Sequence, residues 1–276
     1  MAPMMVMVAG AGSGVGKSTV CLALLIALLR RGGYAPGDLA YVKPTTQCEG
    51  VQLVARWCSA NGVACRGIGP VVYRQGFSYA VIDGTVPPDD LHRDIVEAVR
   101  EVATGKKVVI VDGVGYPAVG SCTKTSNADV AALLGIPVIF VGPEGVGNAI
   151  DSTVMALSFF GERRVRVLGA IYNRISMEGG ARHTLDNCKR YVTTYFERER
   201  RDLHLYGFLP DCKLASMRSS PAAACALPNA RQLPVENLTP DEQAQVVAVE
   251  ATLVPHIDLQ RILDDLAAFS VESSRS

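Results

Sequence analysis

The chain has 276 residues, 49% of them hydrophobic, and its 27 basic residues balance 27 acidic ones. A neutral chain is not built as a general binder of nucleic acid or of anionic membrane surfaces. The eight cysteines form no CxxC pair and the four histidines are dispersed, so their spacing indicates no zinc framework. With no basic signal region at the N-terminus, these features favour a cytoplasmic protein with reduced thiols.

Apolar segments rich in Val and Ile alternate along the chain with segments of helical length. Strands that are apolar on both faces and alternate with helices predict an α/β fold, a mostly parallel sheet with helices on both faces. Ligands of such sheets bind at the carboxyl ends of the strands. The predicted strands span residues 4–9, 39–44, 108–112, 137–142, 165–173 and 203–210. The predicted helices between them span residues 16–31, 49–61, 89–103, 126–134 and 148–160.

The segment after the first predicted strand, GAGSGVGKS, is rich in glycine and leads into an apolar helix. A strand, a glycine-rich loop and GK[ST] opening a helix form a P-loop, whose backbone N–H groups bind phosphate oxygens. Lys17 would reach the β and γ phosphates of ATP, and the Ser18 hydroxyl would bind Mg²⁺. The loop is one residue longer than GxxxxGK[ST], and the alternative is an ordinary strand-to-helix turn. The expected nucleotide-binding residues are Gly12, Ser13, Gly14, Val15, Gly16, Lys17, Ser18 and Thr19.

Two polar residues follow the second predicted strand. Lys43 stands at the strand's carboxyl end before Pro44, which holds the backbone extended, so the lysine is placed to pair with phosphate. Taken alone, Lys43 would be interpreted as a surface lysine. Glu49 opens the next predicted helix, where an acidic residue also interacts favourably with the helix dipole. If Lys43 pairs with the same phosphates as Lys17, the two lysines are the candidate catalytic residues.

The third predicted strand, VVIVD, ends at Asp112, and Gly113 and Gly115 follow it. An acidic residue at the end of an apolar strand, followed by glycine, has the DxxG form of a Walker-B segment, whose carboxylate holds Mg²⁺ directly or through water. The alternative is an aspartate that caps a loop, because Asp-Gly is common in turns. We expect Ser18, Glu49 and Asp112 to converge on one metal ion, since all three lie at or beyond strand ends.

These motifs together resemble the dethiobiotin synthetase family, ATP-dependent enzymes that close a ureido ring on a diamine carbamate, and the related cobyric acid synthases. The family's elongated P-loop GTDTEVGKT is similar to residues 10–18, and YVKP, VDGVG, GVGNAIDS, GAIYNRI and YGFLP follow in the family's order. The resemblance extends to Pro210 and implies a P-loop NTPase fold. It also implies that Lys43 contacts phosphate or carbamate, that Glu49 and Asp112 bind metal, and that Asn173 reads adenine. Asn148 would support substrate across a homodimer interface.

Several segments depart from the family pattern on the substrate side. Gly14 replaces an acidic P-loop residue, KPTTQCEG lacks the Ser-Gly of the family's KPVxSG, and VVYRQGFSYAVIDG stands in place of the family's NPY…SPH segment. After a Pro-, Ala- and Ser-rich stretch, two further helices are expected, opened by Thr239 with Pro240 and by Asp258. We therefore expect a P-loop domain over residues 1–236 and a C-terminal helical extension over residues 237–276, packed on the same domain.

Two functions remain open at this point. The first is an ATP-dependent ligase, in which Mg-ATP phosphorylates a carboxylate or carbamate of a small-molecule substrate that differs from the family's own. The second is a nucleotide-dependent switch or scaffold ATPase that acts through a partner protein. The sequence contains no NKxD-type guanine motif, which favours ATP over GTP. The substrate-side departures are the sequence support for the second function.

Overall fold

The computed structural model describes residues 2–47, 50–177, 184–213 and 237–273. Its main sheet has seven strands, all parallel, in the order β4-β2-β6-β1-β7-β8-β9. The α/β prediction with a mostly parallel sheet is therefore confirmed. The strands are β1 (Met4–Gly10), β2 (Leu39–Val42), β4 (Ala64–Arg66), β6 (Val108–Asp112), β7 (Val138–Gly142), β8 (Val167–Ile175) and β9 (His204–Pro210).

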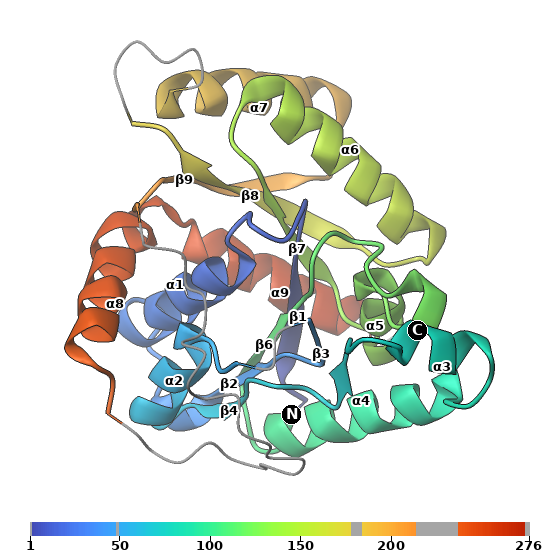
Figure 1. Ribbon diagram of the computed structural model, residues 1–276. Helices are drawn as coiled ribbons and strands as arrows, with labels where there is room; N and C mark the ends of the chain where they lie inside the picture. Colours follow the sequence, from blue (N-terminus) through green and yellow to red (C-terminus); the bar gives the residue numbers. More distant parts are fainter. Residues whose placement is uncertain (1, 48–49, 178–183, 214–236, 274–276) are drawn as a thin grey trace.

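Helices cover both faces of the sheet (Figure 1). One face packs against α1 (Lys17–Arg30), α2 (Leu53–Ala60), α8 (Pro240–Thr252) and α9 (Leu259–Ser273). The other face packs against α4 (Pro88–Ala103), α5 (Asn127–Leu134), α6 (Val146–Glu162) and α7 (Leu185–Glu199). A short helix α3 (Phe77–Ile82) and a small parallel pair, β3 (Thr45–Thr46) with β5 (Val71–Val72), lie in the loops.

The alternating side chains of the central strand explain why both faces need cover. Val6 and Val8 of β1 belong to the core beneath α1, whereas Met7 and Ala9 belong to the core on the opposite face. All four side chains are buried. Since successive strand residues point to opposite faces, an all-apolar strand buries surface on both sides only when helices cover both.

The predicted elements agree with the structure to within a few residues at most ends, and β6 agrees at both ends. The predictions missed α3 and the short strands β3, β4 and β5, and they gave no range for α7. Each of these three strands has three residues or fewer, too few for a periodic pattern to distinguish them from loop. The helix expected from residue 49 begins at Leu53 instead, and most of the predicted loop between residues 211 and 237 lies outside the described residues.

The two helices predicted at the C-terminal end are present. Thr239 caps α8 through a capping box with Glu242, and α9 begins directly after Asp258. The junction between them closes the outer edge of β9: Gly207 pairs with Ile257, and the N–H of Asp258 donates to Tyr206 O at 2.8 Å. Among the described helices, none is both long and apolar enough to cross a membrane.

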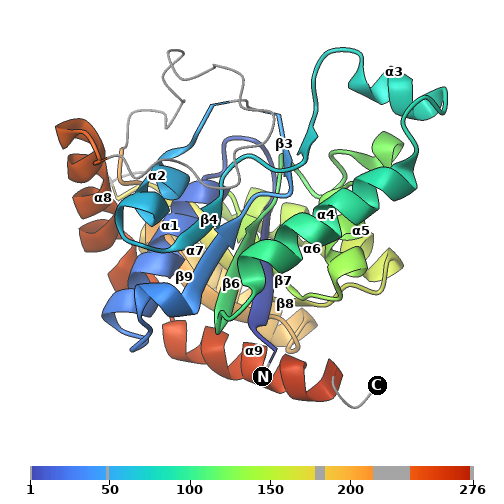
Figure 2. The ribbon, with the colours of Figure 1, turned by 90° about the horizontal axis from the view of Figure 1, so that it is seen from below.

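The loops and α9 lie at opposite ends of the sheet. Figure 2 shows the loops that follow the strands gathered at one end, and α9 with the amino terminus at the other. Asp265 of α9 accepts a hydrogen bond from Tyr206 at 2.7 Å and lies 2.5 Å from His204 Nδ1, which fixes the helix to β9. The end that carries the strand-following loops is the end where ligands of parallel sheets bind.

Candidate functional site

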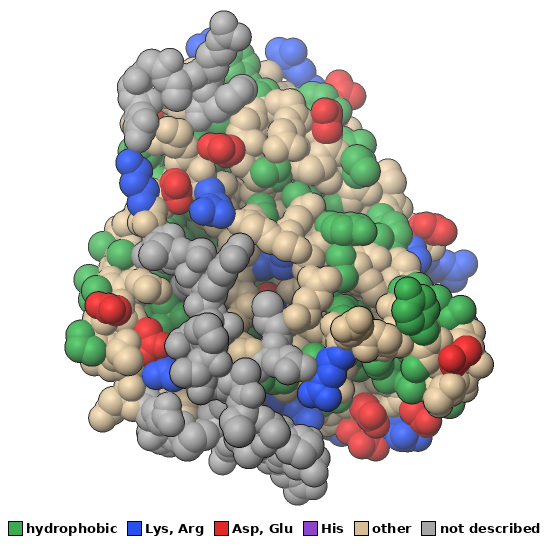
Figure 3. All heavy atoms as spheres, in the orientation of Figure 1, with side chains coloured by type: hydrophobic (Ala, Val, Ile, Leu, Met, Phe, Trp, Pro, Cys, Tyr) green, Lys and Arg blue, Asp and Glu red, His purple; other side chains and the backbone are tan. Residues whose placement is uncertain are grey.

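The P-loop lies between the central strand β1 and helix α1, at the carboxyl ends of the strands. A cleft of about 790 Å³ opens beside it, and Figure 3, which looks onto this end, shows charged side-chain atoms recessed between the loops near the centre. The cleft is therefore where sheet topology predicts a ligand. Its lining includes Ser13, Gly14, Gly16, Lys17, Ser18, Thr19, Lys43, Gln47, Gln52, Gly113, Gly115, Asn173 and Asp211.

Gly16 is the P-loop residue for which the structure requires glycine. It is the N-cap of α1 with φ at 90°, in the left-handed region that glycine adopts without strain. A Cβ at this position would lie 2.3 Å from Asn173 Nδ2, so the close approach of β8 leaves no room for a side chain. The fixed backbone points the N-terminus of α1 into the cleft, where helix N–H groups and the helix dipole favour an anion.

Lys17 lies under the loop and is paired with backbone carbonyls. Its ammonium donates to Gly12 O at 2.8 Å and to Gly115 O at 2.7 Å, so it joins the P-loop to the loop after β6. The side chain is 7% exposed. Burial lowers the pKa of Lys17 to about 8; Asp112 opposes the shift and Lys43 adds to it. A phosphate group in the cleft would favour the charged ammonium and raise this pKa again.

Asp112, at the end of β6, is fully buried and is the centre of the polar network. Its Oδ2 accepts hydrogen bonds from Ser18, Tyr41 and Lys43, each at 2.7 Å. Burial acts to raise the pKa of Asp112, but the charge and hydrogen bond of Lys43, with the two hydroxyl donors, outweigh it, so the pKa lies below its ordinary value. Asp112 is therefore a carboxylate anion beside the P-loop, as a Walker-B aspartate must be.

Two residues of this network were missed by the sequence analysis. Gln52 Oε1 lies 2.8 Å from Ser18 Oγ, and the hydroxyl of Tyr41 donates to Asp112. Gln52 is the N-cap residue of α2, yet its side chain makes no cap hydrogen bond, because it reaches the P-loop instead. A tyrosine in a buried strand needs an acceptor for its hydroxyl, which was a signal for Tyr41. Gln52 gave no such signal, because the helix was expected to begin at residue 49.

The oxygens around Ser18 fit a hard cation such as Mg²⁺. Ser18 Oγ lies 2.7 Å from Asp112 Oδ2 and 2.8 Å from Gln52 Oε1, and hydroxyl, carboxylate and amide oxygens are the ligands such ions take. Within the described part of the chain, the second oxygen of Asp112, Oδ1, is buried without a hydrogen-bond partner. Glu49, the other predicted ligand, lies outside the described residues, so its role stays a prediction.

The two predicted asparagines lie on the other side of the P-loop. Asn173 is 3% exposed and donates to Val15 O at 2.9 Å, which holds the loop in place. Asn148 is an exposed residue in the first turn of α6. Both line a second cavity of about 720 Å³ that also reaches Gly12 and Gly14. The cavity brings Asn148 and Asn173 to one ligand-sized space, and their contacts to substrate and adenine stay predictions.

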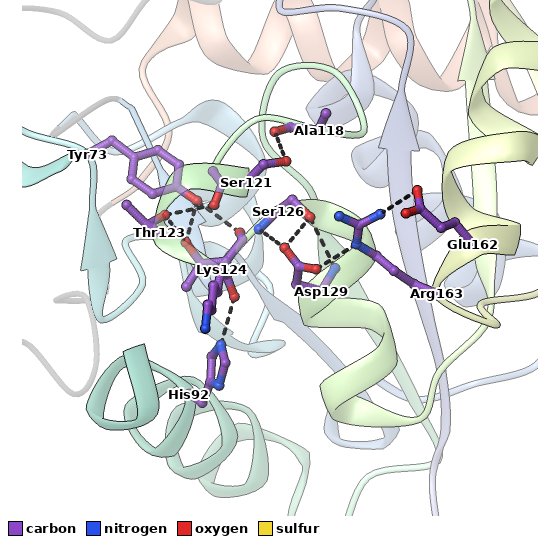
Figure 4. Close-up of polar contacts among 12 residues, drawn as sticks. Tyr73, His92, Ala118, Ser121, Thr123, Lys124, Ser126, Asp129, Glu162 and Arg163 are labelled. Atoms are coloured by element: carbon purple, nitrogen blue, oxygen red, sulfur yellow. Dashed lines mark hydrogen bonds and ion pairs between the residues drawn. The ribbon is translucent and has the colours of Figure 1, made fainter. Parts of the chain in front are cut away.

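The loop that carries Gly115 is anchored at its far end by a polar network (Figure 4). The hydroxyl of Tyr73 donates to Thr125 O at 2.9 Å, and His92 Nε2 lies 2.7 Å from Lys124 O. Asp129, in the capping box of α5, pairs with Arg163 at 2.7 Å. This wall of the cleft is therefore held from both ends, by Lys17 at Gly115 and by the network at residues 124–129.

Comparisons with known proteins identify the kind of domain. A family model described as an AAA domain matches residues 5–212. An ATP-dependent dethiobiotin synthetase of Anaeromyxobacter dehalogenans is 27% identical over 208 residues, which cover 74% of this chain and 90% of the synthetase. A hydrogenobyrinate a,c-diamide synthase of Brucella suis is 31% identical over 182 residues, 64% of this chain and 35% of the synthase. A phosphate acetyltransferase of Pseudomonas aeruginosa is 29% identical over 220 residues, 74% of this chain and 29% of the acetyltransferase.

Proposed function

Because the chain belongs to the dethiobiotin synthetase-like P-loop family, described as an AAA domain, we propose that it is a Mg-ATP-dependent ligase that phosphorylates a carboxylate or carbamate. The observation that carries the proposal is the position of Lys43. Lys43 is 5% exposed and lines the same cleft as Lys17, and its ammonium lies 2.7 Å from Asp112. Two ammonium groups beside one P-loop can neutralise the charge that develops on a transferring phosphoryl group.

The proposed reaction has two steps. A carboxylate oxygen of the substrate attacks the γ-phosphorus, the bond from that phosphorus to the β,γ-bridging oxygen breaks, and ADP leaves with the electron pair. An amine nitrogen then attacks the acyl carbon of the mixed anhydride and loses a proton to solvent, and inorganic phosphate leaves with the electron pair of the broken C–O bond. Lys17 and Lys43 stabilise the γ-phosphoryl oxygens, and the P-loop N–H groups hold the β-phosphate. Ser18, Asp112 and Gln52 would hold Mg²⁺, which supplies further positive charge to the β and γ phosphates.

In this proposal the substrate binds beside the segments that depart from the family pattern. The cleft continues from Lys43 past Gln47 and Gln52, which are neutral hydrogen-bonding residues. Asn148 would contact substrate from a second subunit of a homodimer, with its loop facing the partner's P-loop. This arrangement rests on the resemblance of GVGNAIDS to the family's interface loop and on the exposure of Asn148, which leaves it accessible to a second subunit.

A hydroxylamine trap tests the reaction class without knowledge of the amine. Hydroxylamine captures an acyl phosphate as a hydroxamate, so incubation with Mg-ATP and a panel of small carboxylates is expected to give hydroxamate and ADP in equal amounts. Lys17→Ala is expected to abolish nucleotide binding, measured by calorimetry, while its circular dichroism spectrum stays unchanged. Equal ATP affinity in wild type and Lys17→Ala would contradict the nucleotide site itself.

A second function, a nucleotide-dependent switch or scaffold ATPase, has one specific observation in its favour. The same region is similar to part of a phosphate acetyltransferase, of which this chain covers 29% of the length. The fold therefore also occurs as a segment of a protein whose named activity is not a ligation. ATP turnover that rises with an added protein partner, and no hydroxamate from any carboxylate, would favour this second function.

A further inference from the structure

The carboxyl end of β8 contains a β-bulge beside the P-loop. Tyr172 pairs with Phe208 and Ile175 pairs with Pro210, so β8 has one residue more than β9 between these two pairs. Arg174 lies in this bulge with φ at 63°, in the left-handed region. Glycine is the residue that adopts this conformation without strain, and bulges next to active sites redirect side chains. An arginine at this position points to a role for its side chain.

The bulge directs two neighbouring side chains at the P-loop. Arg174 Nη1 donates to Gly14 O at 2.7 Å, and Asn173 Nδ2 donates to Val15 O at 2.9 Å. In a planar trans peptide the carbonyl and the following N–H point in opposite directions, and no cis peptide occurs among the described residues. Because the carbonyls of Gly14 and Val15 face β8, the N–H groups of Val15 and Gly16 face away from it. Consecutive N–H groups turned to one side are what an oxyanion site requires.

We propose that Arg174 is a positioning residue that holds the P-loop in its phosphate-binding conformation. The inference rests on the proposed nucleotide-binding function and deepens it. The loop has one residue more than a standard P-loop and carries glycine at positions 12, 14 and 16, so its own backbone restrains it weakly. Arg174 supplies a restraint from outside the loop, at the glycine that replaces the family's acidic residue.

The surroundings of Arg174 separate this role from ordinary packing. The Arg174 side chain is 54% exposed, and its Nε lies 3.9 Å from Asp211 Oδ1. An exposed ion pair at this distance contributes little stability. Arg174 also lines both cavities beside the P-loop. The strained backbone of Arg174 therefore places its side chain for the contact with Gly14 O. This contact acts on the P-loop.

Three variants separate the loop contact from the backbone strain. Arg174→Gly removes both, so its melting temperature is expected to equal or exceed that of the wild type while its affinity for Mg-ATP falls at least tenfold. Arg174→Ala keeps the strain and loses the contact, so both melting temperature and affinity are expected to fall. Arg174→Lys keeps a donor and is expected to recover part of the affinity. Stability and affinity that move in opposite directions in Arg174→Gly exclude a merely structural role.

The affinity for inorganic triphosphate distinguishes an effect of Arg174 on the loop from a direct contact with the nucleoside. A loop effect lowers the affinity for magnesium triphosphate and for Mg-ATP by the same factor. A loss confined to ATP would overturn the proposal, as would wild-type affinity in Arg174→Gly. Hydrogen exchange of the P-loop amides without any ligand is expected to be faster in Arg174→Gly. This last measurement tests the contact even if the wild type binds no nucleotide, an outcome that would instead contradict the proposed function.

Discussion

The two ends of the sheet are stabilised by different interactions. At the carboxyl end, charged groups are buried: Lys43 donates to Asp112, and Lys17 nearby donates to the Gly115 carbonyl. At the amino end, α9 covers the strand starts with Leu259, Ile262 and Leu266. Apolar burial stabilises the fold directly, whereas buried charges pay a desolvation penalty that their pairing only offsets. The carboxyl end therefore retains buried charged groups that add little to the stability of the fold and whose function is to bind a ligand.

The largest expected effect comes from breaking the buried pair at the carboxyl end. Lys43→Met removes the partner of a fully buried carboxylate, so the free energy of unfolding is expected to fall by about 3 to 5 kcal/mol. The double variant Lys43→Met with Asp112→Asn removes both charges and is expected to recover most of this loss. Urea unfolding of the three proteins at neutral pH measures it. A single variant as stable as the wild type would show that Lys43 does not compensate the charge of Asp112.

At the amino end, Leu266→Ala removes a buried apolar side chain of α9. The expected loss in the free energy of unfolding is about 2 to 5 kcal/mol, because a cavity remains where the leucine packed. ATP affinity at low temperature is expected to stay unchanged, since α9 lies at the other end of the sheet. Val247→Ala on α8, where the side chain is 64% exposed, is the matched control and should change stability by no more than about 0.5 kcal/mol. A weaker ATP affinity in Leu266→Ala would show that the two ends are coupled.

Nucleotide binding is expected to depend on pH through Lys17, a buried charged group at the carboxyl end. Burial lowers the pKa of Lys17 to about 8, whereas bound phosphate favours the charged ammonium. Below this pH the lysine is already protonated and affinity is flat; above it binding must take up a proton, so affinity falls by up to about tenfold per pH unit. Calorimetry in buffers of different ionisation enthalpy measures the proton uptake. Lys17→Arg, which stays charged, is expected to lose the slope, and a flat wild-type profile above pH 8 would contradict the prediction.

The smallest expected effect is on metal affinity and concerns Gln52, the uncharged residue beside Ser18. Gln52→Glu places a second carboxylate next to Ser18, so Mn²⁺ affinity in the presence of ADP is expected to rise by about fivefold to tenfold, or roughly 1 kcal/mol. Gln52→Ala serves as the control, with weaker binding than the wild type. Electron paramagnetic resonance titration of free Mn²⁺ measures both variants. Unchanged affinity in Gln52→Glu would place Gln52 outside the metal site.

The sequence predicted the parallel sheet because its strands are apolar on both faces and its helices are long enough to show their period. It predicted the P-loop and Asp112 because the loop follows a strand directly and Asp112 is the last residue of one. It missed Gln52 and Tyr41, whose roles depend on side chains that meet across the fold: Tyr41 and Asp112 are 71 positions apart in the chain. The bulge at Arg174 depends on a register shift between β8 and β9, which no local pattern in either strand encodes.

Residues 256–258 cover the edge of β9, and this affects how the chain folds during synthesis. β9 is the outermost strand of the sheet, and its edge pairs with Ile257, in a segment synthesised after every strand of the described sheet. An unpaired strand edge is a template for association with other chains. The nascent chain therefore carries an open edge until its last helices emerge, and truncation before Ile257 would leave that edge exposed to aggregation.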